Sequence, residues 1–278
     1  MAKLAEVRPD AVVLDLEDGV GADGLDAARA RVEKLLAGQG GPLPGFVALR
    51  THAADHRDFV DDVRAIGPEL DALILPKVTS ASDVETASGA LRDAGSEAAG
   101  VIPLIESAAG LLRLEEILRH EAVLGVAFGG EDFAADVGLP PGLRVEQETQ
   151  SASDTRVESA AAARLTVLDS ARSRIVTVAA AVGLRCRVDT PLIQVRPPAL
   201  AEAAARRSRS MGFSGKFAIH PSHVEHVHAG FRPDAEEVAW ARRVLNVNGG
   251  AGAASVGDLM VDEAVLRQAR AVIDSYDA

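Results

Sequence analysis

The feature that most constrains the fold is a repeated alternation of short apolar segments with longer helical ones. The segment from Ala11 to Leu16 (AVVLDL) is followed by a helical pattern from Leu25 to Ala37, and the same succession recurs along the chain. The apolar segments are hydrophobic throughout rather than at every second residue, which is typical of strands buried on both faces of a parallel sheet. The sequence therefore predicts an α/β protein in which helices cover a parallel sheet.

This pattern predicts seven strands, which begin near residues 11, 46, 72, 101, 123, 184 and 216. A closed TIM (β/α)₈ barrel needs eight strands and about 250 residues. A predicted helix from Ala2 to Val7 precedes the first visible strand, so the missing strand would lie just before Met1. We therefore expect a TIM-type barrel that lacks its first strand. The barrel domain is expected to span residues 1–245, and a Gly/Ala-rich hinge with a helical tail to span residues 246–278.

Charge and cysteine content argue against several classes of protein. Asp and Glu total 41 against 29 for Lys and Arg, which gives a formal charge of −12. Such an acidic chain argues against a nucleic acid or an anionic membrane as the main partner, although a small anion can still bind beside a local cation. The single cysteine, Cys186, allows no disulfide within the chain and fits a reducing compartment. Because neither a membrane span nor a signal sequence is evident, we expect a cytoplasmic protein.

Nearly every predicted strand ends in a charged or titratable residue, and in barrels the chemistry lies at these carboxyl ends. Glu106 and Asp132 follow adjacent strands, and two carboxylates with open positions beside them suit Mg²⁺. Zinc is less suitable, since no Cys or His cluster has ligand spacing. Arg50, at the end of an earlier strand, could hold a substrate carboxylate through two hydrogen bonds.

Each of these residues also has a purely structural interpretation. Glu106 and Asp132 could cap the helices that follow them, and Arg50 could form an ion pair with Glu17 or Asp18. Glu17 and Asp18, with Asp15, are expected in supporting positions that hold the arginine and a metal-bound water. Lys77 is expected as a barrel-mouth charge or a structural salt bridge, and His220 as a structural residue. Four further histidines are expected on solvated surface or on a helix: His52, His223, His226 and His228.

Several motifs, in order and at matching spacing, resemble the HpcH/HpaI aldolase/citrate lyase β-subunit superfamily, on its citrate lyase β-like side. The resemblance runs from about residue 3 to the C-terminus. The motifs are DLEDGV at 15–20, LPKV at 75–78, PLIES at 103–107, FGGEDFAADVG at 128–138, GFSGKFAIHPSH at 212–223, FRPDAEEVAWARRVL at 231–245 and LMVD at 259–262.

The resemblance implies a TIM barrel with a C-terminal lid, assembled into trimers or hexamers. It implies a Mg²⁺-dependent lyase that breaks or forms a carbon–carbon bond next to a CoA thioester. Glu106 and Asp132 would be the metal ligands, with Glu106 also at the substrate. Arg50 would bind oxygens of the oxo acid or thioester. Asp262, from the tail of a neighbouring subunit, would complete the catalytic site.

The sequence departs from the family pattern at several places. It lacks the usual first strand, of the type Arg-Ser-x-Leu-Phe-Val-Pro-Gly, which contributes to CoA binding. The family's Arg-Val-Asn is replaced by Arg50-Thr51-His52, QVRPP at 194–198 replaces a more acidic stretch, and the loop before residue 157 is long. Three functions therefore stay open: a citryl-CoA- or malyl-CoA-like lyase, a class II aldolase for free 4-hydroxy-2-oxo acids, and a non-catalytic barrel subunit or scaffold.

Overall fold

The computed structural model describes residues 2–39, 43, 45–65, 70–140, 155–247, 254–256 and 259–277. Its centre is a parallel sheet in which each strand pairs with the next along the chain. The strands are β1 (Ala11–Asp15), β2 (Phe46–Arg50), β3 (Ala72–Leu75), β4 (Gly100–Ile105), β5 (Gly125–Phe128), β6 (Cys186–Asp189) and β7 (Gly215–Lys216). All seven predicted strands are therefore confirmed.

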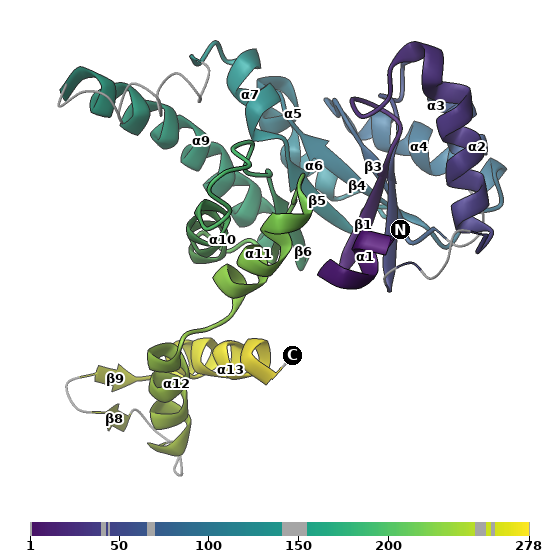
Figure 1. The fold of residues 1–278 in the computed structure, drawn as a ribbon. Coiled ribbons are helices and arrows are strands. Elements are labelled where there is room, and N and C mark those ends of the chain that lie inside the picture. The colour runs from purple at the N-terminus through teal and green to yellow at the C-terminus, as the bar shows by residue number, and fades with distance from the viewer. Residues whose placement is uncertain are drawn as a thin grey trace.

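The sheet curls into an incomplete, TIM-like barrel with helices on its outer side (Figure 1). Within the described part of the chain, β1 and β7 each pair on one side only, so the barrel is open between them. The covering helices are α2 (Leu25–Leu36), α3 (Phe59–Arg64), α4 (Ala81–Asp93), α5 (Ala108–Leu112), α6 (Leu114–Leu118), α7 (Gly130–Asp136), α9 (Thr155–Ala181), α10 (Leu200–Ser210) and α11 (Val224–Phe231).

Two apolar cores lie on the two faces of the sheet. Leu49 and Ile105 belong to the large core between the sheet and the helices, whereas Ala48 and Leu104 belong to a smaller core inside the barrel. Because successive side chains of a strand point to opposite faces, each strand contributes to both cores. This is why the strands are apolar at nearly every position rather than at alternate ones.

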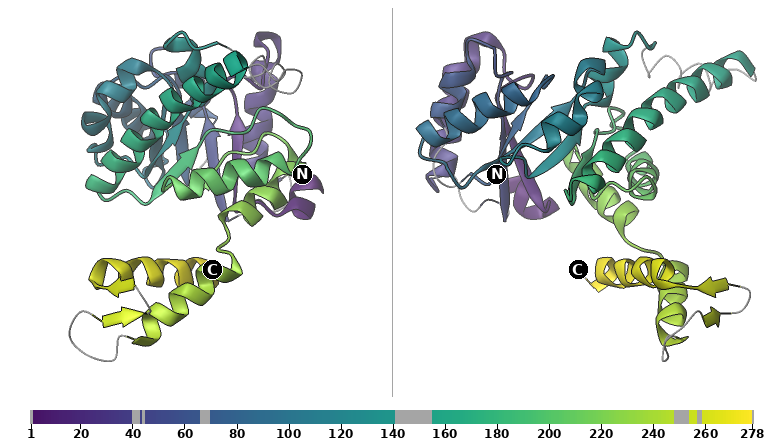
Figure 2. Two further views of the ribbon diagram at one scale, coloured as in Figure 1. Left: turned by 90° about the vertical axis from the view of Figure 1, so that its left-hand side faces the viewer. Right: turned by 180° about the vertical axis from the view of Figure 1, so that it is seen from behind.

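The open side of the barrel is less buried than its centre. All six residues of β4 are buried, whereas β1 has no fully buried residue and Val13 is 36% exposed. The short helix α1 (Ala2–Val7) lies beside the turn η2 (Pro221–His223) on this side (Figure 2). A contact of 3.1 Å between His228 Nε2 and Asp10 Oδ2 joins the two ends of the sheet.

A C-terminal unit stands away from the barrel, on the side from which β1 starts (Figures 1 and 2). It consists of α12 (Ala235–Val247), the antiparallel hairpin β8 (Ala254–Val256) and β9 (Leu259–Val261), and α13 (Glu263–Asp277). These elements share a core of their own, made by Ala241, Val244, Val261, Leu266 and Ala269. Helix α12 thus packs with the tail. Most of this helix lies before residue 245, the expected end of the barrel domain.

Two expected segments lie largely outside the described residues. These are the long loop at 139–155 and the Gly/Ala-rich hinge at 246–257. Among the described helices, none is both long and apolar enough to cross a membrane.

Candidate metal and substrate site

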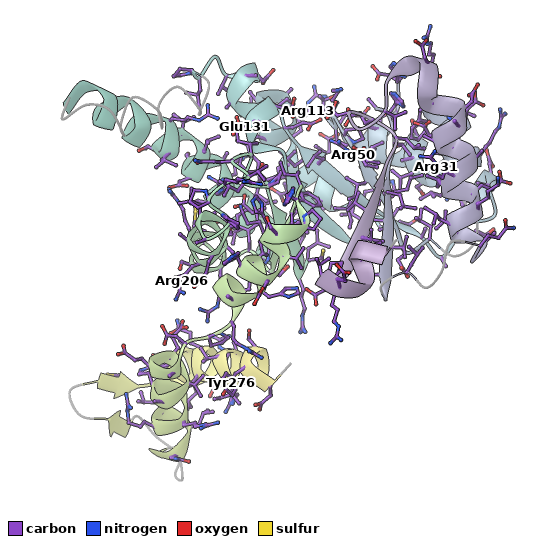
Figure 3. The ribbon with its side chains drawn as sticks, viewed as in Figure 1. Arg31, Arg50, Arg113, Glu131, Arg206 and Tyr276 are labelled. Atoms are coloured by element: carbon purple, nitrogen blue, oxygen red, sulfur yellow. The ribbon has the colours of Figure 1, made fainter. Side chains whose placement is uncertain are left out.

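The carboxyl ends of β1 to β5 bring most of the predicted site residues to one rim of the barrel. In β2, Phe46 and Ala48 face the barrel interior, so the alternation turns Arg50 inward as well. In β4, Ile102 and Leu104 face the interior, and Glu106 continues that row one residue beyond the strand. Figure 3 shows Arg50 at this rim, which also carries Glu131 at the start of α7.

Arg50 is surrounded by three carboxylates from the end of β1. Its Nε and Nη2 donate to the two oxygens of Asp15 at 2.8 and 2.7 Å. Its Nη1 lies 3.0 Å from Glu17 Oε2 and 3.2 Å from Asp18 Oδ2. The ion pairs with Glu17 and Asp18 are those that the structural interpretation predicts. Because Asp15 pairs directly with Arg50 in the β1–β2 register, the two-bonded contact follows from the sheet itself.

This cluster neutralises its own charges. Burial favours the neutral form of Arg50, but hydrogen bonding and attraction from Asp15 outweigh it and raise the arginine pKa. Burial likewise raises the pKa of Asp15, yet the hydrogen bond and charge of Arg50 leave that pKa below its ordinary value. The guanidinium and the Asp15 carboxylate therefore stay charged together at any physiological pH.

Glu106 is held in a different way, by the backbone and by close packing. Its side chain is buried, and Oε1 accepts a hydrogen bond of 2.7 Å from the Lys77 backbone N–H. Lys77 adopts a φ of +55°, a conformation that side chains rarely adopt, and its N–H thereby meets the carboxylate. On the other side, a Cβ at Gly129 would lie 2.7 Å from both Glu106 Cβ and Oε2. A glycine at 129 therefore leaves the space that Glu106 occupies.

The environment of Glu106 disfavours its charged form. Burial is the largest influence, and the negative charges of Asp132 and Glu17 add to it. The backbone N–H and the ammonium group of Lys77 act in the opposite direction. The net result raises the pKa of Glu106 from 4.5 to about 7. The protein partners of Glu106 thus do not balance the charge of its ionised form.

Asp132 lies in the first turn of α7, directly after β5, and is exposed. Its influence on the pKa of Glu106 shows that the two carboxylates act on each other electrostatically. Its neighbour Glu131 is engaged elsewhere, in an ion pair of 2.9 Å with Arg164 of α9. Asp132, rather than Glu131, is therefore the acidic side chain near Glu106.

The donor set of this rim fits Mg²⁺. Two carboxylates suit a hard divalent cation, which usually keeps several waters. The neighbouring acidic groups Glu17 and Asp132 increase the negative potential at Glu106, and a bound cation would relieve it. Lys77 Nζ donates to Glu17 at 2.8 Å, so Lys77 is both a rim charge and a salt-bridge residue.

Two further charged residues, one in β6 and one in β7, turn away from the barrel interior. Asp189 of β6 is buried between the sheet and the helices, where it binds Arg172 Nε at 2.9 Å and Ser208 Oγ at 2.5 Å. Lys216 of β7 lies in the same layer and donates to the Thr190 carbonyl at 2.6 Å. Val188 and Phe217, the neighbours of these two residues, face the barrel interior. Because side chains alternate along a strand, Asp189 and Lys216 face the outer layer. They join β6 and β7 to α9 and α10.

Of the four histidines expected on solvated surface or on a helix, His223 lies in η2 but is buried, and His52 lies outside the helices and is only partly exposed, which corrects the expectation for His52. His223 is 1% exposed, and its Nε2 lies 3.2 Å from the Val195 carbonyl oxygen. His52 is half-buried, with Nδ1 at 2.7 Å from a carboxylate oxygen of the fully buried Asp62. The partner of His52 lies in α3 and that of His223 lies before α10, and no local pattern reveals either contact. His220, expected as structural, accepts from the Ser222 N–H at the start of η2.

Asp262 does not meet the other candidates within this chain. It precedes α13 in the C-terminal unit and accepts a hydrogen bond from the Val265 N–H, as a helix-capping residue does. Figure 3 places that unit, marked by Tyr276, on the far side of the barrel from Arg50. The expectation that Asp262 serves the site of a neighbouring subunit stays a prediction.

Comparisons with known proteins agree with the motifs. A family model described as HpcH/HpaI aldolase/citrate lyase matches residues 1–221. A citrate lyase subunit beta-like protein of Deinococcus radiodurans is 31% identical, over 100% of this chain and 93% of the relative. An L-malyl-CoA/beta-methylmalyl-CoA lyase of Cereibacter sphaeroides is also 31% identical, over 98% of this chain and 88% of the relative.

The fold has the same relatives. The crystal structure of the protein CitE from Mycobacterium tuberculosis, in complex with magnesium, acetoacetate and coenzyme A, superposes with a TM-score of 0.79. It is 28% identical and covers 100% of this chain and 93% of its own. Sequence and fold agree, and the chain belongs to the HpcH/HpaI aldolase/citrate lyase family.

Proposed function

We propose that this protein is a Mg²⁺-dependent carbon–carbon lyase for a hydroxyacyl-CoA thioester similar to citryl-CoA or malyl-CoA. It would release an acyl thioester and a 2-oxo acid, or join them in the reverse direction. The observation that carries the proposal is the buried, unbalanced carboxylate of Glu106 beside Asp132. Similarity to CoA-thioester lyases and to a structure with magnesium and coenzyme A supports the substrate class.

Glu106 and Asp132 would hold the metal ion. The Lys77 N–H and the close approach of Gly129 fix the Glu106 carboxylate in place before any ligand arrives. Such preorganisation matters because a misplaced ligand weakens every interaction that depends on it. When bound, Mg²⁺ acts as a Lewis acid that favours negative charge on the neighbouring substrate oxygens.

Arg50 would bind the substrate carboxylate or thioester oxygen. Asp15 occupies two of its donor positions and fixes the plane of the guanidinium. Asp18 is the weakest of its partners, since its side chain is 72% exposed and lies 3.2 Å away. A substrate oxygen that replaced Asp18 at Nη1 would complete the coordination of Arg50 without disturbing Asp15. The proposed assembly into trimers or hexamers would bring Asp262 of another subunit to this rim, where a carboxylate could move a proton.

The test is a calorimetric titration of the full chain with Mg²⁺ in the presence of oxaloacetate or glyoxylate. It compares the wild type with Glu106→Gln, which retains the side-chain shape and the acceptor for the Lys77 N–H. We expect Mg²⁺-dependent binding in the wild type and at least about 100-fold weaker binding in the variant. Folded wild-type protein without such binding would refute the metal assignment and favour a non-catalytic subunit.

A second titration with coenzyme A separates the substrate classes. A CoA-thioester lyase binds coenzyme A, and binding would lead to a screen of hydroxyacyl thioesters for cleavage. Cleavage of free 4-hydroxy-2-oxo acids without coenzyme A binding would instead identify an aldolase, and the thioester proposal would be wrong.

A further inference from the structure

The loop between β2 and α3 contains a second group of possible metal ligands, apart from Glu106 and Asp132. One ligand atom each of His52, His56 and Asp58 lies within 4.8 Å of the other two. The three residues follow Arg50 within eight positions, but none of them takes part in the contacts of Arg50 or Glu106 described above. We propose that His52, His56 and Asp58 form a binding site for a first-row transition-metal dication, of which Zn²⁺ is the example tested.

His52 is held as a metal-ligating histidine commonly is. Its Nδ1 lies 2.7 Å from Asp62 Oδ2, and its backbone N–H donates to the same oxygen at 2.9 Å. Asp62 is fully buried, and its other oxygen accepts from Arg29 Nε at 2.9 Å, so the carboxylate cannot turn away. A carboxylate that accepts a hydrogen bond from Nδ1–H keeps the proton on that nitrogen, which leaves the lone pair of Nε2 for a metal and makes the imidazole a stronger donor.

His56 and Asp58 are spaced to bind one ion together. The distance from His56 Nδ1 to Asp58 Oδ2 is 3.6 Å. Two ligands at 2.0–2.1 Å in a tetrahedral zinc site lie about 3.4 Å apart, so a small side-chain movement suffices. His56 Nδ1 accepts from the Asp58 backbone N–H at 3.2 Å. This nitrogen is therefore unprotonated, as a ligand must be, and a metal would replace the backbone hydrogen bond at its one lone pair.

The two imidazole rings already lie together. Their centroids are 4.5 Å apart and their planes differ by 13°. His56 is 45% exposed, so its ring can turn toward the ion without opening the core. Imidazole and carboxylate ligands favour zinc and its neighbours in the transition series, whereas Mg²⁺ prefers oxygen ligands alone. We therefore expect the transition metal to bind at the loop and Mg²⁺ to bind at the Glu106 rim.

The cations near the site do not occupy its ligand atoms at close range. Asp58 receives long contacts of 3.4 Å from Arg29 Nη2 and from Arg57 Nε. Arg57 is 86% exposed, and Arg29 has shorter contacts with Asp62 and with the Asp58 carbonyl. A dication at Asp58 would thus compete with two weak ion pairs, one of them largely screened by solvent.

The experiment uses the full chain, stripped of metal with a chelator and kept in excess Mg²⁺ so that the Glu106 rim is supplied. Zn²⁺ is titrated against a colorimetric zinc indicator. We expect one equivalent to bind, and His56→Ala and Asp58→Asn each to weaken that binding about tenfold or more. Zn²⁺ should also raise the melting temperature of the wild type but not of His56→Ala.

Two controls make the result specific. His228→Ala removes a histidine of similar exposure, 42%, from another part of the surface and should leave Zn²⁺ affinity unchanged. Glu106→Gln should leave it unchanged as well, so failure of the proposed lyase function would not affect this test. The proposal is wrong if no Zn²⁺ binds in Mg²⁺, if His56→Ala and Asp58→Asn bind it as the wild type does, or if Glu106→Gln alone abolishes binding.

Discussion

Two parts of the barrel rim differ in whether their charges are balanced by opposite charges. At the ends of β1 and β2, every carboxylate faces a cation: Arg50 contacts Asp15, Glu17 and Asp18, and Lys77 contacts Glu17. At the ends of β4 and β5, Glu106 is buried with Asp132 nearby, and a backbone N–H is its hydrogen-bond donor.

This difference shows at which end of the rim the charges are already balanced by opposite charges. The pKa of Asp15 falls and that of Arg50 rises, so the first cluster stabilises its own charges. The pKa of Glu106 rises, so folding places this group where its charged form is unfavourable. Structural ion pairs tend to behave like the first cluster, whereas perturbed, unbalanced groups gather at functional sites. The comparison therefore separates a cluster that balances its own charges from the carboxylates that we propose as a cation site.

The largest expected effect comes from removing the cation of the satisfied cluster. Arg50→Ala leaves Asp15 and the 7% exposed Glu17 without their shared partner. Loss of one side of such a largely buried ion pair should lower the free energy of unfolding by about 3 kcal/mol, measured by urea denaturation at pH 7. Asp18→Asn is the control, because its 72% exposed side chain should contribute about 0.5 kcal/mol or less. Equal losses in the two variants would contradict the ranking of these contacts.

A smaller effect, on activity rather than stability, is expected at the ends of β4 and β5, where the charge of Glu106 is not balanced. In Gly129→Ala the new methyl group would lie 2.7 Å from Glu106 Cβ and Oε2 and would push the carboxylate aside. The φ of Gly129 is −97°, so alanine fits the backbone and the fold should persist. If Glu106 holds the metal, kcat/KM should fall about 100-fold because a ligand moves by about 1 Å.

Gly45→Ala provides the matched control for this substitution. A Cβ at Gly45 meets no atom within 4 Å, so activity should stay at the wild-type level. Wild-type activity in Gly129→Ala would show that the position of Glu106 does not matter for catalysis.

The smallest effect concerns the pH dependence of stability without metal. The folded-state pKa of Glu106, about 7, lies above its ordinary value of 4.5. Between these values the folded protein binds a proton that the unfolded chain has released, so stability falls as pH rises through this window. Glu106→Gln carries no titrating group there. Its advantage in unfolding free energy over the wild type should grow by about 2 kcal/mol from pH 5 to pH 8.

Denaturation of both proteins at the two pH values, with and without Mg²⁺, measures this difference. Mg²⁺ at pH 8 should stabilise the wild type and leave Glu106→Gln unchanged. If the difference in unfolding free energy between the wild type and Glu106→Gln is the same at both pH values, folding does not raise the pKa of Glu106.

Much of the molecule was predictable from local patterns. The seven apolar segments gave the strands and their order, because a strand buried on both faces needs apolar residues at nearly every position. The motifs gave the family, which the comparisons confirm. The sequence also predicted that Arg50 and Glu106 lie at strand ends, and the alternation of the strands turns both toward the barrel interior.

Other features depend on contacts between distant parts of the chain. The packing of α12 with α13 brings residues on both sides of the hinge into one core, and composition does not reveal such a contact. The burial of His52 depends on Asp62 of α3 and on Arg29 of α2. Composition and periodicity describe one element at a time and contain no information on such partners.

The sequence by itself determined the order of the strands, the family and the residue types at the barrel rim, since these follow from periodicity and from motifs within single segments. Only the tertiary structure decided which charges are balanced. Asp15 and Glu106 are both acidic groups at strand ends, yet one faces a guanidinium and the other a backbone N–H and a further carboxylate. Electrostatic energy depends on distance and burial, and both are set by packing between elements far apart in the chain.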